Sequence, residues 1–343
     1  MRLKPHRPSH EILSGESADV YFHRAQAILE REGLDPLVAV EVFGRAAGVL
    51  CGIDEAKNLL AHALAGAQTG EAQVEGLDDG DTIAPREVVL RIRARYRLIG
   101  LYETTILGMM AQATGWATAA RECVEAAAPE PVISFGARHV HPDVADVLDY
   151  AAIVGGCVGA STPAGARLAG LNPTGTMPHS LVLIMGDTVE AARAFERDLD
   201  PDVPRIILVD TFRDEAEEAL RVAGALGERL YGIRLDTPAE RGRVTADLVK
   251  EVRARLDQAG HGHVRIVVSG GLTPDRIRQF KEQGAPADSF AVGSHISGAS
   301  PIDFTADIKE IDGRPIAKRG RIPGLTPSPR LRPVDLAAWR EGG

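Results

Sequence analysis

Aromatic residues and cysteines are scarce in this sequence of 343 residues. Phe, Trp and Tyr together make up only 4% of it, which argues against an aromatic-rich surface for carbohydrate or single-stranded nucleic acid. The three cysteines, Cys51, Cys123 and Cys157, stand far apart and form no CxxC pair. We therefore expect neither a disulfide framework nor a cysteine zinc site, and a reducing cytoplasm is the simplest compartment.

Long apolar runs and an excess of positive charge are absent as well. No stretch approaches the ~20 apolar residues that a membrane-spanning helix needs, and the N-terminal segment MRLKPHRPSHEILSGESADV lacks the apolar region of a secretory signal. The formal net charge of −9 argues against broad binding to nucleic acid or acidic membranes. We expect a cytoplasmic protein that binds neither, and whose arginines are concentrated locally if its ligand is an anion.

The first 118 residues predict a mixed α/β N-terminal domain. Apolar residues at helical spacing alternate there with segments of alternating apolar and polar residues. Gly33 is placed to end the first helix, and the DDGD turn at 78–81 separates two antiparallel strands. The expected helices cover 19–32, 54–66 and 100–127, and the expected strands cover 37–43, 71–77 and 86–96.

Residues 119–301 predict an incomplete, seven-stranded α/β barrel. Seven short apolar runs alternate with amphipathic segments, and several runs are apolar throughout, as in parallel strands that are covered on both faces. Successive βα units in this number indicate a barrel or near-barrel. The seven runs are PVISF (131–135), GGCVGA (155–160), LNPTG (171–175), PRIILVD (204–210), YGIRLD (231–236), HVRIVVSGG (263–271) and DSFAVGS (288–294).

The C-terminal segment 302–343 predicts a further strand pair that turns at Asp312–Gly313. We expect this pair to return to the sheet of the N-terminal domain. The last residues are rich in proline and arginine and predict an extended surface tail.

Glycines and polar residues follow nearly every predicted strand, at the edge where parallel barrels bind ligands. Ser269-Gly270-Gly271 follows one strand, and Gly293-Ser294 follows the last. Glycine N–H groups can approach a phosphate closely, and a following helix N-terminus favours its charge. One such loop is adequately explained as a tight turn, but two in adjacent units favour a phosphate-bearing ligand.

Charged residues at other strand ends could bind the rest of such a ligand. Arg234 and Asp236 are two apart on one strand, so both side chains can point to the same side. Asp210 could hold Mg²⁺ through water or cap a helix, and both interpretations stay open. Arg138, with His139 beside it, could pair with a carboxylate or phosphate. His179 precedes an apolar run and is either a structural polar residue or part of the site.

Several other residues are interpreted as structural, and the positions of the lysines argue against a Schiff-base mechanism. Thr237 with Glu240 matches a capping box, Thr273 precedes a proline at a helix start, and Asp187 is placed to cap the next helix. All six lysines fall outside the predicted strand ends. A Schiff-base mechanism is therefore disfavoured.

The ordered set of strand ends resembles nicotinate phosphoribosyltransferase in its shorter bacterial and archaeal form, a member of the type II phosphoribosyltransferases. The resemblance covers nearly the whole chain. It implies the barrel and the N-terminal domain predicted above, and a head-to-tail homodimer with shared active sites, with a higher oligomer left open. The matching motifs are DVYF (19–22), ISFGARHVHP (133–142), GTMPHSL (175–181), LVDTF (208–212), GIRLDTP (232–238), VSGGLTP (268–274) and AVGSHISG (291–298).

The resemblance also implies an activity in NAD biosynthesis. The 5-phosphoribosyl group of phosphoribosyl pyrophosphate would pass to nicotinate, giving nicotinate mononucleotide and pyrophosphate, with Mg²⁺ present and ATP hydrolysed alongside. The sequence carries no cysteine after Cys157, so the zinc knuckle of some archaeal relatives is not expected. His179 would be the residue that ATP phosphorylates, which couples hydrolysis to the transfer.

The remaining roles are implied by the resemblance. Tyr21 of the partner subunit and Phe135 would stack on the two faces of the pyridine ring, and Ser161 would lie near its substituent. Arg138 would bind pyrophosphate or substrate with His139 beside it, and Gly175 and Thr176 would meet the nicotinate carboxylate. Arg234 and Asp236 would hold the ribosyl part near Asp210. The 5-phosphate would lie against Ser269, Gly270, Gly271, Gly293 and Ser294.

Other activities stay open at this point. A nicotinamide or quinolinate phosphoribosyltransferase would use the same strand ends, although Ser161 stands where the nicotinamide enzyme carries an aspartate, which favours nicotinate. A barrel isomerase acting on a sugar phosphate would share the phosphate loops. A non-catalytic nucleotide sensor would bind without turnover.

Overall fold

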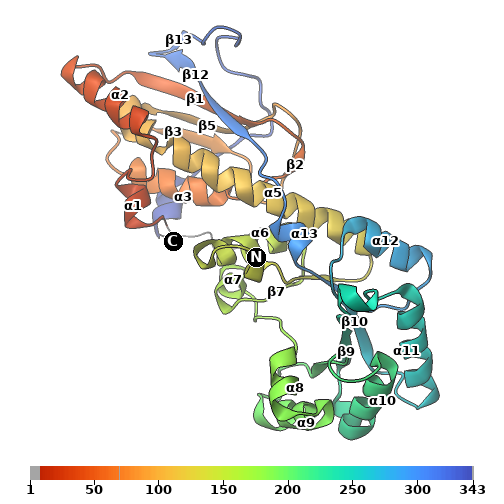
Figure 1. Ribbon diagram of the computed structural model, residues 1–343. Coiled ribbons are helices and arrows are strands. Elements are labelled where there is room, and N and C mark those ends of the chain that lie inside the picture. The colour runs from red at the N-terminus through yellow and green to blue at the C-terminus, as the bar shows by residue number, and fades with distance from the viewer. Residues whose placement is uncertain (1–7, 69, 342–343) are drawn as a thin grey trace. The chain divides into compact units, whose positions relative to one another are not determined.

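The computed structural model describes residues 8–68 and 70–341, which fall into two compact units. The first unit holds the described residues through Thr118, the short segment Leu168–Gly170, and the residues from Ala299 onward. The second unit holds Ala119–Arg167 and Leu171–Gly298. Residues 1–7, the start of the N-terminal segment discussed above as lacking a signal pattern, lie outside the described residues. The elements are numbered in chain order, and Figure 1 labels many of them.

The first unit is built on a six-stranded sheet with the order β13-β12-β1-β5-β3-β14. The three strands predicted within the first 118 residues are confirmed, and each pairs antiparallel with its neighbour. A separate two-stranded sheet joins β2 to β4. The strands of this unit are β1 (Leu37–Gly44), β2 (Gly48–Val49), β3 (Gln73–Gly76), β4 (Thr82–Ile83), β5 (Val88–Arg95), β12 (Phe304–Ile311), β13 (Arg314–Pro315) and β14 (Arg332–Pro333).

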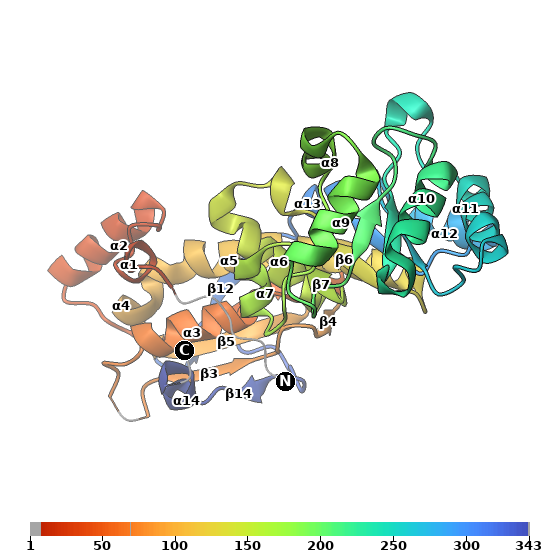
Figure 2. The ribbon, with the colours of Figure 1, turned by 90° about the horizontal axis from the view of Figure 1, so that it is seen from below.

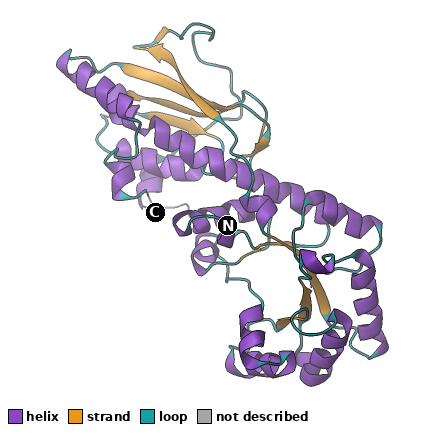
Figure 3. Cartoon of the chain, viewed as in Figure 1, coloured by secondary structure: helices purple, strands orange, loops and turns teal. Residues whose placement is uncertain are grey.

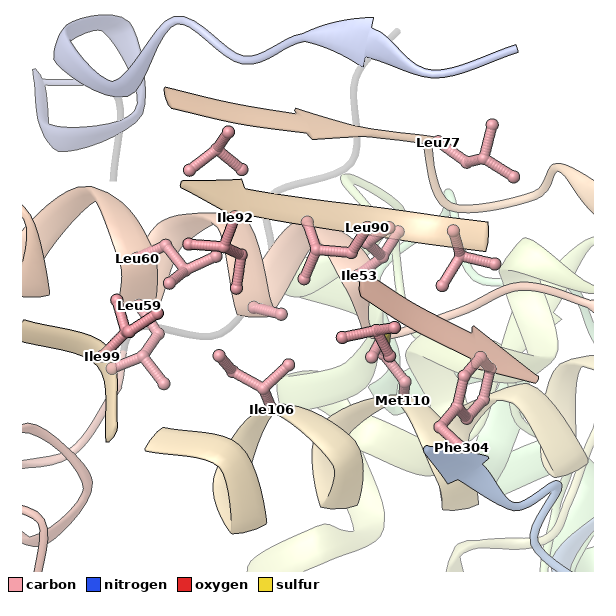
Figure 4. Packing of buried hydrophobic residues seen from close by; sticks show 14 of the residues in the cluster. Ile53, Leu59, Leu60, Leu77, Leu90, Ile92, Ile99, Ile106, Met110 and Phe304 are labelled. Atoms are coloured by element: carbon pink, nitrogen blue, oxygen red, sulfur yellow. The ribbon is translucent and has the colours of Figure 1, made fainter. Parts of the chain in front are cut away.

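Helices cover this sheet and bury its main core. Figure 4 shows side chains of α3, β5 and α5 turned toward one another in that core, among them Leu60, Ile92 and Met110. The pattern follows from apolar residues at helical spacing on α3 and at alternate positions on β5. The helices of this unit are α1 (His10–Leu13), α2 (Val20–Arg31), α3 (Ile53–Ala63), α4 (Tyr96–Ile99), the 3₁₀ turn Gly100–Tyr102, the first part of α5 (Glu103–Ala127), and α14 (Leu336–Glu341).

The C-terminal segment returns to this sheet, as predicted. β12 pairs with β1, and the turn at Asp312–Gly313 has left-handed backbone angles of +50° and +75°. The prediction of an extended surface tail is wrong for its end. β14 pairs with β3, and α14 packs against α3 with Trp339 only 9% exposed (Figure 2). The sequence pattern does not predict α14 because the helix is only six residues long. Its apolar face is too short to be recognised among the surrounding Pro and Arg residues.

The second unit contains a curved parallel sheet with the order β7-β6-β11-β10-β9-β8. Helices follow most of its strands (Figure 3). Six of the seven predicted strands are present in the described residues. These are β6 (Val132–Ser134), β7 (Gly159–Ala160), β8 (Ile206–Leu208), β9 (Gly232–Leu235), β10 (Arg265–Val268) and β11 (Ser289–Val292).

The seventh predicted strand, LNPTG (171–175), is irregular instead. The Thr174 N–H donates to the Ala160 carbonyl at 2.8 Å, and the Met177 N–H donates to the Ile206 carbonyl at 3.3 Å. The segment therefore lies between β7 and β8, the two edges of the sheet. Pro173 and Pro178 have no N–H to donate, so a continuous ladder cannot form. The prediction of a seven-stranded barrel is thus corrected to a six-stranded half-barrel with an irregular closing segment.

Helices and short turns connect the strands of the second unit. Asp187 and Thr273 accept hydrogen bonds from the first turns of their helices, as predicted. The capping box at Thr237 is wrong, because its hydroxyl donates to Glu215 at 2.6 Å. Besides the end of α5, the helices are α6 (Ala145–Val154), α7 (Pro163–Leu168), α8 (His179–Met185), α9 (Thr188–Asp198), α10 (Glu215–Leu226), α11 (Ala246–Gln258), α12 (Pro274–Glu282), α13 (Ser294–Ser297) and the 3₁₀ turns Ala137–His139, Pro142–Val144, Gly227–Arg229 and Ala239–Arg241.

Strand register decides which residues face the inside of the half-barrel. Ile206, Val267 and Ala291 pack together with Phe135, which marks the inner face. Arg234 is level with Leu208 and Val267 in the parallel register, so it shares that face. Side chains alternate along a strand. The next inner positions toward the carboxyl ends are Asp210, Asp236, Ser269 and Gly293.

No helix among residues 8–68 and 70–341 combines the length and apolar character needed to cross a membrane.

The core of the first unit gives a stability prediction. Leu60 is fully buried, so Leu60→Ala should lower the free energy of unfolding by about 2–5 kcal/mol through lost burial and a cavity. Ile322→Ala is the matched control, because Ile322 is 82% exposed and should change stability by less than about 0.5 kcal/mol. Denaturant unfolding followed by circular dichroism measures both. Equal stability of the two variants would contradict the packing described here.

Candidate active site

The carboxylate of Asp236 joins three side chains at the open edge of the half-barrel. The Ser269 hydroxyl donates to Asp236 Oδ1 at 2.8 Å, and Arg234 Nη2 donates to Asp236 Oδ2 at 3.2 Å. His179 Nε2 lies 3.8 Å from the same Oδ2. Burial alone would raise the pKa of Asp236, but the neighbouring His179 and Arg234 outweigh it and lower that pKa below its ordinary value. Asp236 is therefore a stable anion between two cationic groups.

His179 stands at the start of α8 and points to the ends of two strands. Its Nδ1 lies 3.0 Å from Thr211 Oγ1, and its Nε2 lies 3.5 Å from Asp210 Oδ2. The neighbouring Asp236 carboxylate raises the pKa of His179, and the charge of Asp210 acts in the same direction. His179 keeps 38% of its side chain exposed. The imidazolium is thus both stabilised and accessible to a ligand.

Asp210 is the most buried acid of this cluster. Its side chain is 2% exposed, and its Oδ1 has no hydrogen-bond partner within the described part of the chain. Burial raises the pKa of Asp210 above its ordinary value. A buried carboxylate oxygen without a donor is costly unless a ligand completes it. Asp210 does not cap α10, since Asp214 accepts the hydrogen bonds there.

A divalent cation fits this pair of carboxylates in chemical terms. Oxygen ligands suit Mg²⁺, which usually takes one or two carboxylates and completes its shell with water and substrate phosphates. Asp210 and Asp236 offer this arrangement, and the unpartnered Asp210 Oδ1 is the atom such an ion would complete. Within residues 8–68 and 70–341, no group of three or more His, Cys, Asp or Glu is placed to hold a metal by itself.

Arg234 reaches across the inner face of the half-barrel. Its Nη1 donates to Thr176 Oγ1 at 2.7 Å, and its guanidinium carbon lies 5.8 Å from the centre of the Phe135 ring. Its Nε is buried and lacks an acceptor among the described residues. Arg234 therefore fixes the irregular segment through Thr176 and keeps a donor for a ligand.

The two glycine loops lie at adjacent strand ends, because β10 and β11 pair in parallel. Gly270 and Gly271 have φ angles of +91° and +62°, which glycine adopts readily and other residues do not. No acceptor is found in the described structure for the N–H groups of these two glycines. In α13, which follows the second loop, the Ser297 hydroxyl contacts His139 Nδ1 at 3.2 Å. Backbone donors are thus available for an anion.

The other predicted residues are placed around or apart from this cluster. Arg138 and His139 form an exposed 3₁₀ turn after β6. Ser161 follows β7 and is half-buried, and Gly175 lies on the irregular segment. Tyr21 belongs to the first unit, where it is 56% exposed on α2. The roles of these residues and of Ser294 stay predictions.

Sequence reasoning missed three residues that contact the site, and a fourth, Glu215, that holds the residue following Asp236. Thr211 binds His179, Glu215 accepts from Thr237, and Arg243 and Arg276 contact the Gly270–Gly271 turn. Thr211 lies within the quoted motif LVDTF and could have been noticed there. No local pattern marks the two arginines, because their position depends on the path of distant loops.

The chain matches two domains of one enzyme family. Residues 116–307 match the quinolinate phosphoribosyl transferase C-terminal domain, and residues 19–114 match the N-terminal domain. Together these matches cover most of the chain. They differ from the resemblance predicted above in the pyridine substrate that the family is named for.

Individual relatives carry one of two names, nicotinate phosphoribosyltransferase or nicotinate-nucleotide pyrophosphorylase. Nicotinate phosphoribosyltransferase pncB1 of Mycobacterium tuberculosis is 32% identical over 255 residues, which are 72% of this chain and 55% of that protein. The chain thus spans about half the length of the curated relatives it matches. The solved nicotinate-nucleotide pyrophosphorylase of Pyrococcus furiosus is 41% identical, with a TM-score of 0.85, and covers 95% of this chain and 82% of its own.

A third comparison concerns the fold alone. The nicotinate-nucleotide pyrophosphorylase of Ehrlichia chaffeensis has a TM-score of 0.67 at 18% identity and covers 87% of this chain and 96% of its own. The two domain matches agree with the division of the chain into two compact units. They also agree with the half-barrel and its edge of acidic residues and glycines. The chain belongs to the quinolinate phosphoribosyltransferase family.

Proposed function

We propose that this protein is a phosphoribosyltransferase of NAD biosynthesis and that its pyridine substrate is quinolinate. The reaction joins the pyridine nitrogen to the phosphoribosyl group of phosphoribosyl pyrophosphate and yields nicotinate mononucleotide, pyrophosphate and CO₂. One observation carries the proposal: the Arg234–Asp236–His179–Asp210 cluster lies at the same sheet edge as two glycine loops. The two domain matches and the Pyrococcus furiosus relative favour quinolinate over nicotinate.

The residues supply positioning and charge, which this reaction needs. The pyridine nitrogen is already unprotonated near neutral pH, so attack requires no strong base. The ribosyl carbon becomes cation-like as pyrophosphate leaves, and the Asp236 carboxylate would stabilise that charge. Asp236 and Asp210 would hold Mg²⁺, which would neutralise charge on the pyrophosphate. Arg138 and the His179 imidazolium would bind the leaving anion.

Quinolinate adds a second carboxylate, which leaves as CO₂. The bond between ring carbon and carboxylate breaks once the ring nitrogen is ribosylated, because the positive pyridinium takes up the electron pair. A proton then replaces the lost group. Burial of the two substrate carboxylates requires cationic partners, and Arg234 has one unsatisfied Nε in the described structure.

Nicotinate is the second candidate, and the curated relatives favour it. In that reaction no CO₂ is released, and ATP would phosphorylate His179 to drive the transfer. His179 is half-exposed and its Nδ1 contacts Thr211, which leaves Nε2 as the nitrogen that faces the carboxylates. His179→Ala would then weaken ATP stimulation more than basal transfer.

An assay with parallel substrates tests the function. The protein is mixed with Mg²⁺, phosphoribosyl pyrophosphate and one of quinolinate, nicotinate or nicotinamide, each with and without ATP. We expect pyrophosphate and CO₂ in equal amounts from quinolinate, independent of ATP. Pyrophosphate from nicotinate alone, stimulated by ATP, would select the second candidate. No pyrophosphate from any mixture would overturn the proposal.

Arg234 gives a mutational prediction. Arg234→Ala removes the donors to Thr176 and Asp236, so turnover should fall by about 100-fold or more while circular dichroism stays unchanged. Arg265→Ala is the matched control on the neighbouring strand, where the side chain stacks on Tyr231 instead. Steady-state rates decide the question. Comparable activity of the two variants would remove Arg234 from the site.

The charge of His179 gives a prediction in solution. Because Asp236 and Asp210 raise its pKa, the imidazole should titrate above the ordinary value of roughly 6.5. Its positive charge is then lost only as the pH rises through that higher pKa. Asp236→Asn should lower the midpoint, whereas Asp198→Asn, at an exposed pair with Arg197, should not. NMR titration of the imidazole C–H signal measures it, and an unchanged midpoint in Asp236→Asn would contradict this account.

A further inference from the structure

Two arginines converge on the glycine turn after β10. Arg276 Nη1 donates to the carbonyls of Gly270 and Gly271 at 3.0 and 3.1 Å, and its Nη2 donates to the Val244 carbonyl at 3.1 Å. Arg243 lies on the other side of the turn. A Cβ added to Gly271 would fall 2.1 Å from Arg243 Nη1, so the guanidinium rests directly on the glycine α-carbon.

The two positive charges have no acidic partner. Neither Arg243 nor Arg276 forms an ion pair with any residue the structure describes, although the chain carries a net charge of −9 and many other arginines are paired. Burial lowers the pKa of Arg276, and the charge of Arg243 lowers it further. Two like charges this close to each other, without a counter-charge among the described residues, favour the binding of an anion beside them.

The backbone of Arg243 is held in an unfavourable conformation. Its φ angle is +66°, directly after Gly242 at +90°. A residue with a Cβ pays a steric cost there that glycine does not. The Arg243 backbone N–H donates to the Pro238 carbonyl at 3.1 Å, whereas the side chain of Arg243 is exposed and has no hydrogen bond among the described residues. Glycine would adopt this backbone conformation at a lower steric cost than arginine. The presence of arginine therefore favours a function for its guanidinium group.

The turn presents donors on the face left open. The carbonyls of Gly270 and Gly271 are occupied by Arg276, and their N–H groups have no acceptor in the described residues. The start of α12 follows at once, with Thr273 accepting from the Arg276 N–H at 3.3 Å. Two backbone donors, a helix N-terminus and an unpaired guanidinium therefore meet at one point.

We propose that Arg243 binds the phosphate monoester of the ribosyl donor at the Gly270–Gly271 turn. Arg276 is a positioning residue, which holds the carbonyls of the turn away from that phosphate. This assignment rests on the proposed function for the identity of the ligand. The guanidinium would donate one or two charge-assisted hydrogen bonds to the phosphate. No local sequence motif predicts this role for Arg243.

The test uses binding as well as turnover. Arg243→Gly removes the guanidinium and relieves the left-handed backbone, so its thermal midpoint should equal or exceed that of the unaltered protein. Calorimetry with ribose 5-phosphate, and with inorganic phosphate, should show affinity reduced by at least tenfold. The KM for phosphoribosyl pyrophosphate should rise by a similar factor, while the KM for the pyridine substrate stays unchanged.

Two further variants set the controls. Arg241→Ala lies two residues away on the same exposed loop and should bind like the unaltered protein. Arg243→Lys should recover part of the affinity. Phosphate binding that is lost in Arg243→Gly, in a protein that transfers no phosphoribosyl group, would support the anion site while the proposed function fails. Equal affinity of Arg243→Gly and the unaltered protein, or a lower thermal midpoint with unchanged KM, would overturn the assignment.

Discussion

The site depends on the register of the parallel sheet. Val267 faces inward, and its pairing with Arg234 turns that side chain to the same face. The two-residue period of a strand then carries Asp236 and Ser269 one step further toward the carboxyl edge. A slip of one residue in β9 would turn Arg234 and Asp236 away from the centre together. The apolar pairs of the sheet therefore place the polar groups, although they take no part in the chemistry.

The polar groups in turn fix one another's charge. Asp236 stays ionised because His179 and Arg234 lie beside it, and His179 gains positive charge from the same contact. Asp210, which is buried and receives fewer donors, is pushed the other way. The two acids of one edge thus differ in their readiness to lose a proton. Such a difference would suit the proposed transfer, in which a cation-like carbon and a leaving anion are held at once.

Much of this arrangement could be predicted from the sequence, because strand pattern and strand ends are local features. Six apolar runs became strands, and Asp210, Arg234, Asp236 and Ser269 do lie together. The strand predicted at LNPTG is absent because Pro173, and Pro178 beyond it, have no N–H to donate to a ladder. The predicted cap at Thr237 is absent because the Thr237 hydroxyl donates to Glu215 instead. The orphaned arginine charges at Gly270–Gly271 could not be predicted. Arg243 comes close to Arg276 because its loop has a left-handed backbone at Arg243, which is not a glycine.

The irregular segment between β7 and β8 has a consequence for motion. The backbone of Thr174 and Met177 is tied to the flanking strands by single hydrogen bonds at 2.8 and 3.3 Å, whereas β9 is bonded along its length to strands on both sides. Local opening needs little free energy where few buried bonds must break. Amide hydrogens there should exchange with solvent ahead of those in the sheet. Opening of this segment beside His179 would also have to break the Arg234–Thr176 hydrogen bond and expose Met177, so we expect local opening to be coupled to the state of Arg234 while the strands of the sheet stay paired.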